Sequence, residues 1–160
     1  MKELTIALLG VCLFCSCGNK KILDESHTFD RNIWNRFTME EFSFNVPNID
    51  NYYNIDITVA VDTIRYRYDM VPIAVNLISP DGEKRRILTS VALKEKGRWR
   101  GEMQDGYRTA QGRVRSYFSF NHKGQHRMEV GQQTSQYDLE GIYSVAVHIE
   151  KAKLDYSNLD

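Results

Sequence analysis

The sequence predicts an all-β protein: a single antiparallel β-sandwich, immunoglobulin-like or jelly-roll-like, that follows a short N-terminal region of different character. Three observations predict this fold. From Glu41 onward, apolar and polar residues alternate with a period of two in one segment after another. Turn sequences rich in Pro, Gly, Asn and Asp separate these segments. No stretch of comparable length keeps apolar residues at helical spacing, so two sheets that pack their apolar faces together account for the pattern.

The first two strands are expected at residues 42–46 and 55–62. In the first, phenylalanine and valine alternate with serine and asparagine, and Pro47-Asn48 ends the run. In the second, four β-branched residues alternate with aspartate, threonine and alanine. That composition is typical of a strand with one buried face.

The next pair of strands is expected at residues 73–77 and 87–93, on either side of Ser79-Pro80-Asp81-Gly82. Proline presets φ for a turn and glycine permits a positive φ, so this tetrapeptide predicts a tight reversal. The two strands are therefore expected to pair with each other.

The last strands are expected at residues 114–120, from Met128 onward, and at 143–150. Residues 121–124, Asn-His-Lys-Gly, break the first of these. Between residues 94 and 112 the chain has four glycines and little periodicity, which predicts a long connection with a short edge strand at 99–103. Residues at the inward phase of four separate strands are expected to be buried: Val59, Val75, Phe118 and Val147.

Residues 1–16 have the pattern of a removable export signal. Lys2 precedes a run of about 13 mostly apolar residues, the length of a signal-peptide core. A membrane span needs about 20 apolar residues, so this run is too short to be one. The run ends in Phe14-Cys15-Ser16-Cys17, in which small Ser16 stands directly before a thiol. This ending predicts cleavage before Cys17 and lipidation of that cysteine.

The division of the chain follows from this signal. We expect a lipidated N-terminus and tether over residues 17–38, a β-sandwich domain over residues 39–151 and a C-terminal tail over residues 152–160. The three cysteines are at 12, 15 and 17, so the mature chain has no disulfide and depends on its core for stability. The formal net charge is zero, which argues against nucleic acid as a partner.

No constellation of residues indicates catalysis, a metal or a cofactor. The sequence has no Gly-x-Ser-x-Gly elbow and no glycine-rich phosphate loop, so we expect a protein that is not an enzyme. His122 and His126 flank a turn and could face each other, but a structural zinc site needs four ligands. We therefore expect these two histidines to lie at a solvated hairpin tip and not to bind zinc. His27 and His148 have no evident partner.

Two clusters combine aromatic and basic residues. Residues 65–68 read Arg-Tyr-Arg-Tyr, and Gly97-Arg98-Trp99-Arg100-Gly101 places a tryptophan between two arginines. Both fit an ordinary strand with rings inward, and both fit docking of a protein or a sugar. If the domain has a working surface, we expect it on the 94–112 connection. The candidate contact residues there are Trp99, Arg98, Arg100 and Tyr107.

Several phrases in this order resemble one family over nearly the whole mature chain. They are Phe42-Ser43-Phe44-Asn45-Val46-Pro47, Tyr53-Asn54-Ile55-Asp56-Ile57, Ile78-Ser79-Pro80-Asp81-Gly82, Gly97-Arg98-Trp99-Arg100-Gly101 and residues 139–151, Leu-Glu-Gly-Ile-Tyr-Ser-Val-Ala-Val-His-Ile-Glu-Lys. Together with the lipid-modification cysteine and the length, they are similar to the gliding-motility lipoprotein family GldH of Bacteroidetes.

The resemblance implies a non-enzymatic envelope lipoprotein of the gliding and linked secretion machinery, with Cys17 as its lipidated residue. Other envelope proteins would be its partners. The residues after Cys17 are basic, Lys20-Lys21, without the acidic cluster of surface-exported lipoproteins. We therefore expect the periplasmic face of the outer membrane. The alternative is a glycan-binding accessory lipoprotein of a polysaccharide-uptake system, using Tyr66, Tyr68, Trp99 or Tyr107.

Overall fold

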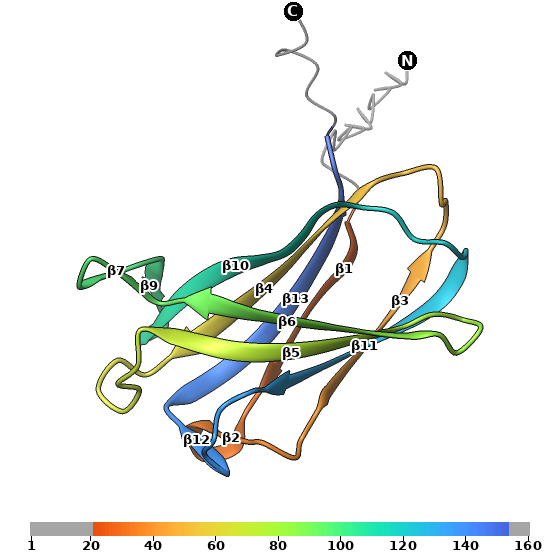
Figure 1. The fold of residues 1–160 in the computed structure, drawn as a ribbon. Helices are drawn as coiled ribbons and strands as arrows, with labels where there is room; N and C mark the ends of the chain where they lie inside the picture. Colours follow the sequence, from red (N-terminus) through yellow and green to blue (C-terminus); the bar gives the residue numbers. More distant parts are fainter. Residues whose placement is uncertain (1–20, 154–160) are drawn as a thin grey trace, which may run out of the picture.

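The computed structural model describes residues 21–153, and in this part of the chain two antiparallel sheets pack face to face (Figure 1). The five-stranded sheet has the order β1-β13-β4-β10-β9, and the four-stranded sheet has the order β3-β11-β5-β6. The predicted all-β sandwich is confirmed. The chain passes repeatedly from one sheet to the other, so strands that are distant in sequence become neighbours.

The elements have the following bounds. The five-stranded sheet contains β1 (Lys21–Thr28), β13 (Ile142–Lys151), β4 (Tyr53–Val61), β10 (Tyr107–Phe118) and β9 (Glu102–Gln104). The four-stranded sheet contains β3 (Glu40–Val46), β11 (Gly124–Gln132), β5 (Met70–Ile78) and β6 (Lys84–Ala92). Two small ribbons pair β2 (Ile33–Asn35) with β12 (Asp138–Glu140) and β7 (Lys94–Glu95) with β8 (Arg98–Trp99); a short 3-10 helix, η1, covers Asp30–Asn32.

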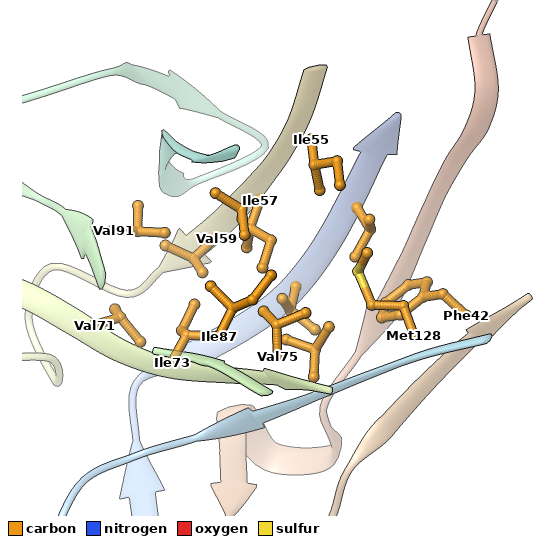
Figure 2. Packing of buried hydrophobic residues seen from close by; sticks show 14 of the residues in the cluster. Phe42, Ile55, Ile57, Val59, Val71, Ile73, Val75, Ile87, Val91 and Met128 are labelled. Carbon is orange, nitrogen blue, oxygen red and sulfur yellow. The ribbon is translucent and has the colours of Figure 1, made fainter. Parts of the chain in front are cut away.

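The core lies between the two sheets and uses the alternation seen in the sequence. Val59 of β4 and Val75 of β5 are fully buried, and Val147 of β13 is buried beside them, as predicted. Figure 2 shows Val59 and the side chains of β5 directed into the same interior. Because every second residue of a strand points to the same face, alternation brings the apolar residues of both sheets into one layer.

Residues 21–28 form a strand of the larger sheet, and this corrects the predicted tether over residues 17–38. Lys21 pairs with Glu150 and Thr28 pairs with Ser144 along β13. Trp34 is fully buried, and its ring stacks on that of Phe29 at 4.8 Å. The polar sequence of β1 misleads because β1 is an edge strand, and most of its side chains remain exposed. The folded domain therefore includes residues 21–38 and does not begin at residue 39.

The inward phase predicted for β10 is wrong at its end. The pairing of β10 with β4 shifts register twice, between Arg113 and Arg115 and again between Arg115 and Phe118. A bulge adds a residue to one strand and disrupts the alternation. Phe118 is only partly buried there, whereas Phe120, at the same predicted phase just after the strand, is 3% exposed and occupies the core.

The predicted 94–112 connection is shorter in the structure. It ends at Gly106, because β10 already begins at Tyr107. Gly112 lies within β10, where β6 passes so close that a Cβ atom would stand 3.1 Å from Val91 Cγ2. This glycine reflects a close approach between sheets and not a loop.

The sandwich has two distinct ends (Figure 1). At one end, which we call the anchor end, β1 begins at Lys21 and β13 ends at Lys151. At the opposite end, which we call the distal end, lie β2, β12 and the loops of residues 62–69 and 133–137.

Candidate functional site

The distal end exposes an unusual number of large apolar side chains. Of the ten that are exposed within residues 21–153, five lie there: Phe37, Ile64, Tyr68, Met70 and Tyr137. Ile64 is 78% exposed and Phe37 is 73% exposed. Single exposed apolar residues are common on protein surfaces, but a cluster of them marks an interaction site more often.

A groove of about 240 Å³ opens among these residues. We call it the distal groove. It lies between the loop of residues 62–69 and the loop of residues 133–137, with the start of β5 beneath it. Its lining residues are Tyr66, Tyr68, Met70, Pro72, Thr134, Ser135 and Gln136.

The first wall of the groove is held by a hydrogen-bonded turn. Asp62 Oδ1 accepts the backbone N–H groups of Ile64 and Arg65, and the Asp62 carbonyl accepts that of Tyr66 at 2.8 Å. The Tyr66 ring is buried, and its hydroxyl donates to the Met70 carbonyl at 2.7 Å. Burial raises the pKa of Tyr66, and the neighbouring Tyr68 hydroxyl acts in the same direction. The Tyr66 hydroxyl is therefore a fixed, neutral structural group.

The second wall is organised by Gln132, a buried side chain at the end of β11. Its amide donates to the Gln136 carbonyl at 3.0 Å, and its oxygen accepts from the backbone and the hydroxyl of Thr134, each at 2.7 Å. These bonds fold residues 132–136 into a compact loop. Gln136 Nε2 then donates to the Tyr68 hydroxyl across the groove, so the two walls are joined at the surface.

Beside the second wall is an exposed aromatic pair with an arginine. The rings of Phe37 and Tyr137 lie 5.7 Å apart, and the Arg36 guanidinium lies 5.7 Å from each of them. The Arg36 backbone N–H donates to the Tyr137 carbonyl at 2.7 Å, and its side chain donates to the Ser135 carbonyl at 3.4 Å. Since Ser135 also lines the groove, the aromatic pair and the groove form one continuous surface.

The charges at the distal end are unevenly paired. Arg65 pairs with Glu140 at 3.5 Å, and Lys94 pairs with Asp69 at 3.1 Å. Within residues 21–153, Arg36 and Arg67 form no ion pair with a carboxylate. Two arginines next to groove residues therefore lack an acidic partner in the described structure: Arg67 adjoins Tyr66 and Tyr68 in the sequence, and Arg36 contacts Ser135.

Trp99, the leading candidate from the sequence, lies in the β7–β8 hairpin beside the distal end. Its ring is half-buried against the core, with Lys94 Nζ 4.6 Å from the ring centroid. Arg98 and Arg100 are both exposed, as an interface would require. The Lys94–Asp69 ion pair and two backbone hydrogen bonds to the Asp69 carbonyl connect this hairpin to the loop that forms the groove.

Tyr107 lies on a different surface from Trp99. It stacks on Tyr143 with ring centroids 4.0 Å apart and planes at 6°, on the outer face of the larger sheet. The pair borders a second hollow, whose floor consists of small residues such as Ala60 and Ala146. The structure therefore separates Tyr107 from the residues with which the sequence grouped it.

The two histidines of the predicted hairpin tip do not face each other as ligands, and His122 Nε2 lies 3.6 Å from Asp81 Oδ2. His126 is 2% exposed and stacks on Phe44, and its Nδ1 lies 3.0 Å from the Gly124 carbonyl; it is a core residue and not part of a solvated hairpin tip. His27 lies between Glu25 and Glu40 at 2.9 and 2.8 Å, and His148 lies 2.6 Å from Asp24.

Within residues 21–153, no group of three or more histidine, cysteine, aspartate or glutamate side chains is placed to hold a metal ion. Over the same residues, no helix has the length and apolarity required to traverse a bilayer. Cys17, the predicted lipidation site, lies outside the described residues.

Sequence reasoning singled out Tyr66 and Tyr68 but missed most of this surface. Met70, Gln136 and Tyr137 belong to no alternating pattern or motif, and they become neighbours only because two loops converge. The only feature of the sequence that pointed to this surface was the alternation of Tyr68 with the neighbouring Arg67. Of the two tyrosines, Tyr66 faces the core and is 1% exposed, whereas Tyr68 is 50% exposed.

Comparison with protein families finds a match over most of the chain. Residues 21–149 match the model of a family described as GldH lipoprotein, which is well over half of the chain and nearly all of the folded part. The matched region begins and ends within β1 and β13, so it covers the whole sandwich. No curated protein matches the chain.

Proposed function

The chain belongs to the GldH lipoprotein family, and we propose that it is an outer-membrane lipoprotein of the gliding-motility and linked secretion machinery. In this proposal Cys17 carries the lipid, and the sandwich stands on the periplasmic face of the membrane. The domain does no chemistry of its own. It acts as an assembly or scaffold protein by binding another envelope protein at its distal end.

The anchor follows from the N-terminal sequence. Each buried CH₂ of an acyl chain contributes about 0.8 kcal/mol, so a lipoprotein with two or three chains is held almost permanently. Lys21 begins the first strand, which leaves only residues 18–20 between the lipidated cysteine and the folded domain. The anchor end would therefore stay close to the bilayer, and the distal end would point away from it.

The observation that carries the proposal is the exposed apolar surface at the distal end. Its aromatic side chains and arginines are the residue types over-represented among those that contribute most to protein interfaces. Arg98, Trp99 and Arg100 border this surface on the β7–β8 hairpin, and we propose that they contribute to the same contact. Tyr107 would bind a partner only through the separate hollow.

The glycan-binding alternative has less support in the geometry. Tyr66 is buried and its hydroxyl is occupied by the Met70 carbonyl. Tyr107 and Tyr143 stack on each other, so each ring offers at most one free face to a sugar. A sugar platform needs an exposed ring face, and Tyr68 is the clearest one near the distal groove.

The experiment compares the full chain with Cys17→Ala in the native envelope. We expect the full chain to carry lipid label and to co-purify with protein components of the gliding or secretion machinery. Cys17→Ala should lose the label and leave the membrane fraction, or remain unprocessed. Normal labelling of Cys17→Ala would contradict the anchor. Co-purification with polysaccharide-uptake proteins instead would favour the glycan alternative.

A further inference from the structure

We propose that the distal groove, together with the Phe37–Tyr137 pair, binds a segment of another envelope protein in which apolar side chains are flanked by carboxylates. This inference rests on the proposed function, because it assumes that the domain is held at Cys17 and acts through a protein partner. It adds the surface that binds and the chemistry of the segment that is bound.

The position of the groove argues against the membrane as its occupant. Residues 18–20 and Lys21 extend at most about 14 Å from Cys17. β1 has eight residues and runs about 26 Å from the anchor end toward the distal end. β1 ends on the side of the loops that wall the groove, so the start of β1 and these loops are at opposite ends of the sandwich (Figure 1).

The shape and lining of the groove fit apolar side chains. Met70 is half-exposed at its base, and methionine adapts to irregular partners because its side chain is unbranched and polarizable. The Tyr68 ring packs edge-on against the buried Tyr66 ring at 5.5 Å, so it is held in place before any partner arrives. A rigid ring loses little conformational freedom when it is covered.

The charges around the groove specify the rest of the partner. Arg67 is exposed between the two groove tyrosines, and Arg36 lies over the aromatic pair. Neither has a carboxylate partner within residues 21–153, whereas nearby Asp69 and Glu140 are each paired. An arginine that is covered by a partner requires an opposite charge, because an unpaired cation is costly to remove from water. The bound segment should therefore supply carboxylates at the edges of its apolar contact.

Photo-crosslinking of the full, lipidated chain in its native envelope tests this proposal. A photoreactive phenylalanine analogue replaces Met70 or Tyr137 at the distal end. The matched control replaces Leu88, which is 67% exposed on β6, away from the groove. We expect a product of the same defined mass from both distal positions and not from Leu88. Mass spectrometry of that product should identify a segment with apolar and acidic residues.

Charge reversal then tests the recognition itself. Arg67→Glu should lower the yield of the product about fivefold or more, and Arg67→Lys should keep most of it. Arg67 is exposed and makes no side-chain hydrogen bond or ion pair in the described structure, so both variants should fold, which an unchanged melting temperature would show.

The remaining outcomes separate this proposal from the proposed function. A protein product from Leu88 alone would overturn the groove but leave a protein-binding scaffold standing. No protein product from any position would contradict the scaffold role itself. A product containing glycan or lipid, a product within the same chain, or equal yields from Arg67→Glu and Arg67→Lys would each overturn the acidic protein segment.

Discussion

The interior of the sandwich and the distal end use the same apolar residue types in opposite ways. Between the sheets, tyrosine, methionine and isoleucine side chains such as Tyr53, Met128 and Ile73 are at most 1% exposed. At the distal end, Tyr68, Met70 and Ile64 are at least half exposed. Most apolar residues of the interior come from paired strands, and those of the distal end come from loops and strand ends.

This difference shows that residue type alone does not decide burial here. In a paired strand, the backbone fixes the side of the sheet to which each side chain points, so an apolar residue at the right phase is buried. In a loop, the backbone follows local hydrogen bonds such as those to Asp62 and Gln132, and side chains are left where these bonds place them. The comparison therefore predicts a large stability cost inside and a small one at the distal end.

The largest expected effect is in the interior. The ring of Phe120 contacts those of Phe44, Tyr53, Phe118 and His126, with centroids 4.9 to 5.7 Å away. Phe120→Ala should lower the free energy of unfolding by about 3–5 kcal/mol, the usual cost for a buried phenylalanine.

The control for this change is at the distal end. Met70→Ala should change the free energy of unfolding by roughly 0.5 kcal/mol or less, as expected for surface positions. Urea denaturation measures both variants. Phe118→Ala should fall between them, because its ring is only partly buried; a cost equal to that of Phe120→Ala would mean that the two interior positions are equivalent after all.

The second largest expected effect is a loss of stability at Gly141, where the core packs against the loop that forms the distal groove. Gly141 has a φ of +86°, and a Cβ atom there would lie 2.6 Å from the backbone nitrogen of Tyr66. Gly141→Ala should cost about 2–4 kcal/mol, from roughly 1 kcal/mol for the left-handed backbone and roughly 1–3 kcal/mol for overpacking. Gly82→Ala is the matched control, with a φ of +88° and open space around it. It should cost only about 1 kcal/mol.

Trp99 lies between the two regions and should show a mixed effect. Its ring packs partly on the core and partly on Lys94. Trp99→Ala should cost about 1–2 kcal/mol of stability, less than the 3–5 kcal/mol of a fully buried ring, and should weaken co-purification with partners. A large fall in the melting temperature of Trp99→Ala would indicate that Trp99 serves the core and not a partner. Full retention of partners would contradict a contact role.

The smallest expected effect is the pH dependence of the stability that two histidines, His27 and His126, contribute. Burial lowers the pKa of His27, but the hydrogen bonds with Glu25 and Glu40 outweigh it and raise that pKa above its ordinary value. Its contribution is therefore fully present below about pH 6.5 and is lost as the pH rises through the raised pKa. Burial lowers the pKa of His126. Its contribution is present above about pH 6.5 and is lost as the pH falls through the lowered pKa.

Unfolding measured at pH 5 and pH 8 separates these contributions. His27→Gln should cost more at pH 5 than at pH 8, by a few tenths of a kcal/mol to about 1 kcal/mol, as for other surface ion pairs. His126→Gln should destabilise at both values but less at pH 5, where protonation already penalises the native ring. If the cost of both variants changed in the same direction between pH 5 and pH 8, the opposite pKa shifts of His27 and His126 would be contradicted.

The sequence by itself determined the sandwich and most of its core. Alternation with a period of two is a local property of strands, so the inward positions of Val59, Val75 and Val147 could be predicted without knowing any partner strand. The turn at Ser79–Gly82 was equally local: the Gly82 N–H donates to the Ser79 carbonyl at 2.9 Å, and Gly82 has a positive φ.

Only the tertiary structure decided what depends on contacts between distant residues. The strand at Lys21–Thr28 carries little apolar pattern, because its stability comes from pairing with β13 more than a hundred residues later. The bulges of β10 arise from its pairing with β4, and at the end of this strand Phe118 is only partly buried although Phe120 lies in the core. The distal groove forms only because two loops converge. Loop backbones have no fixed period, so the spacing of residues in the sequence could not predict that they would meet.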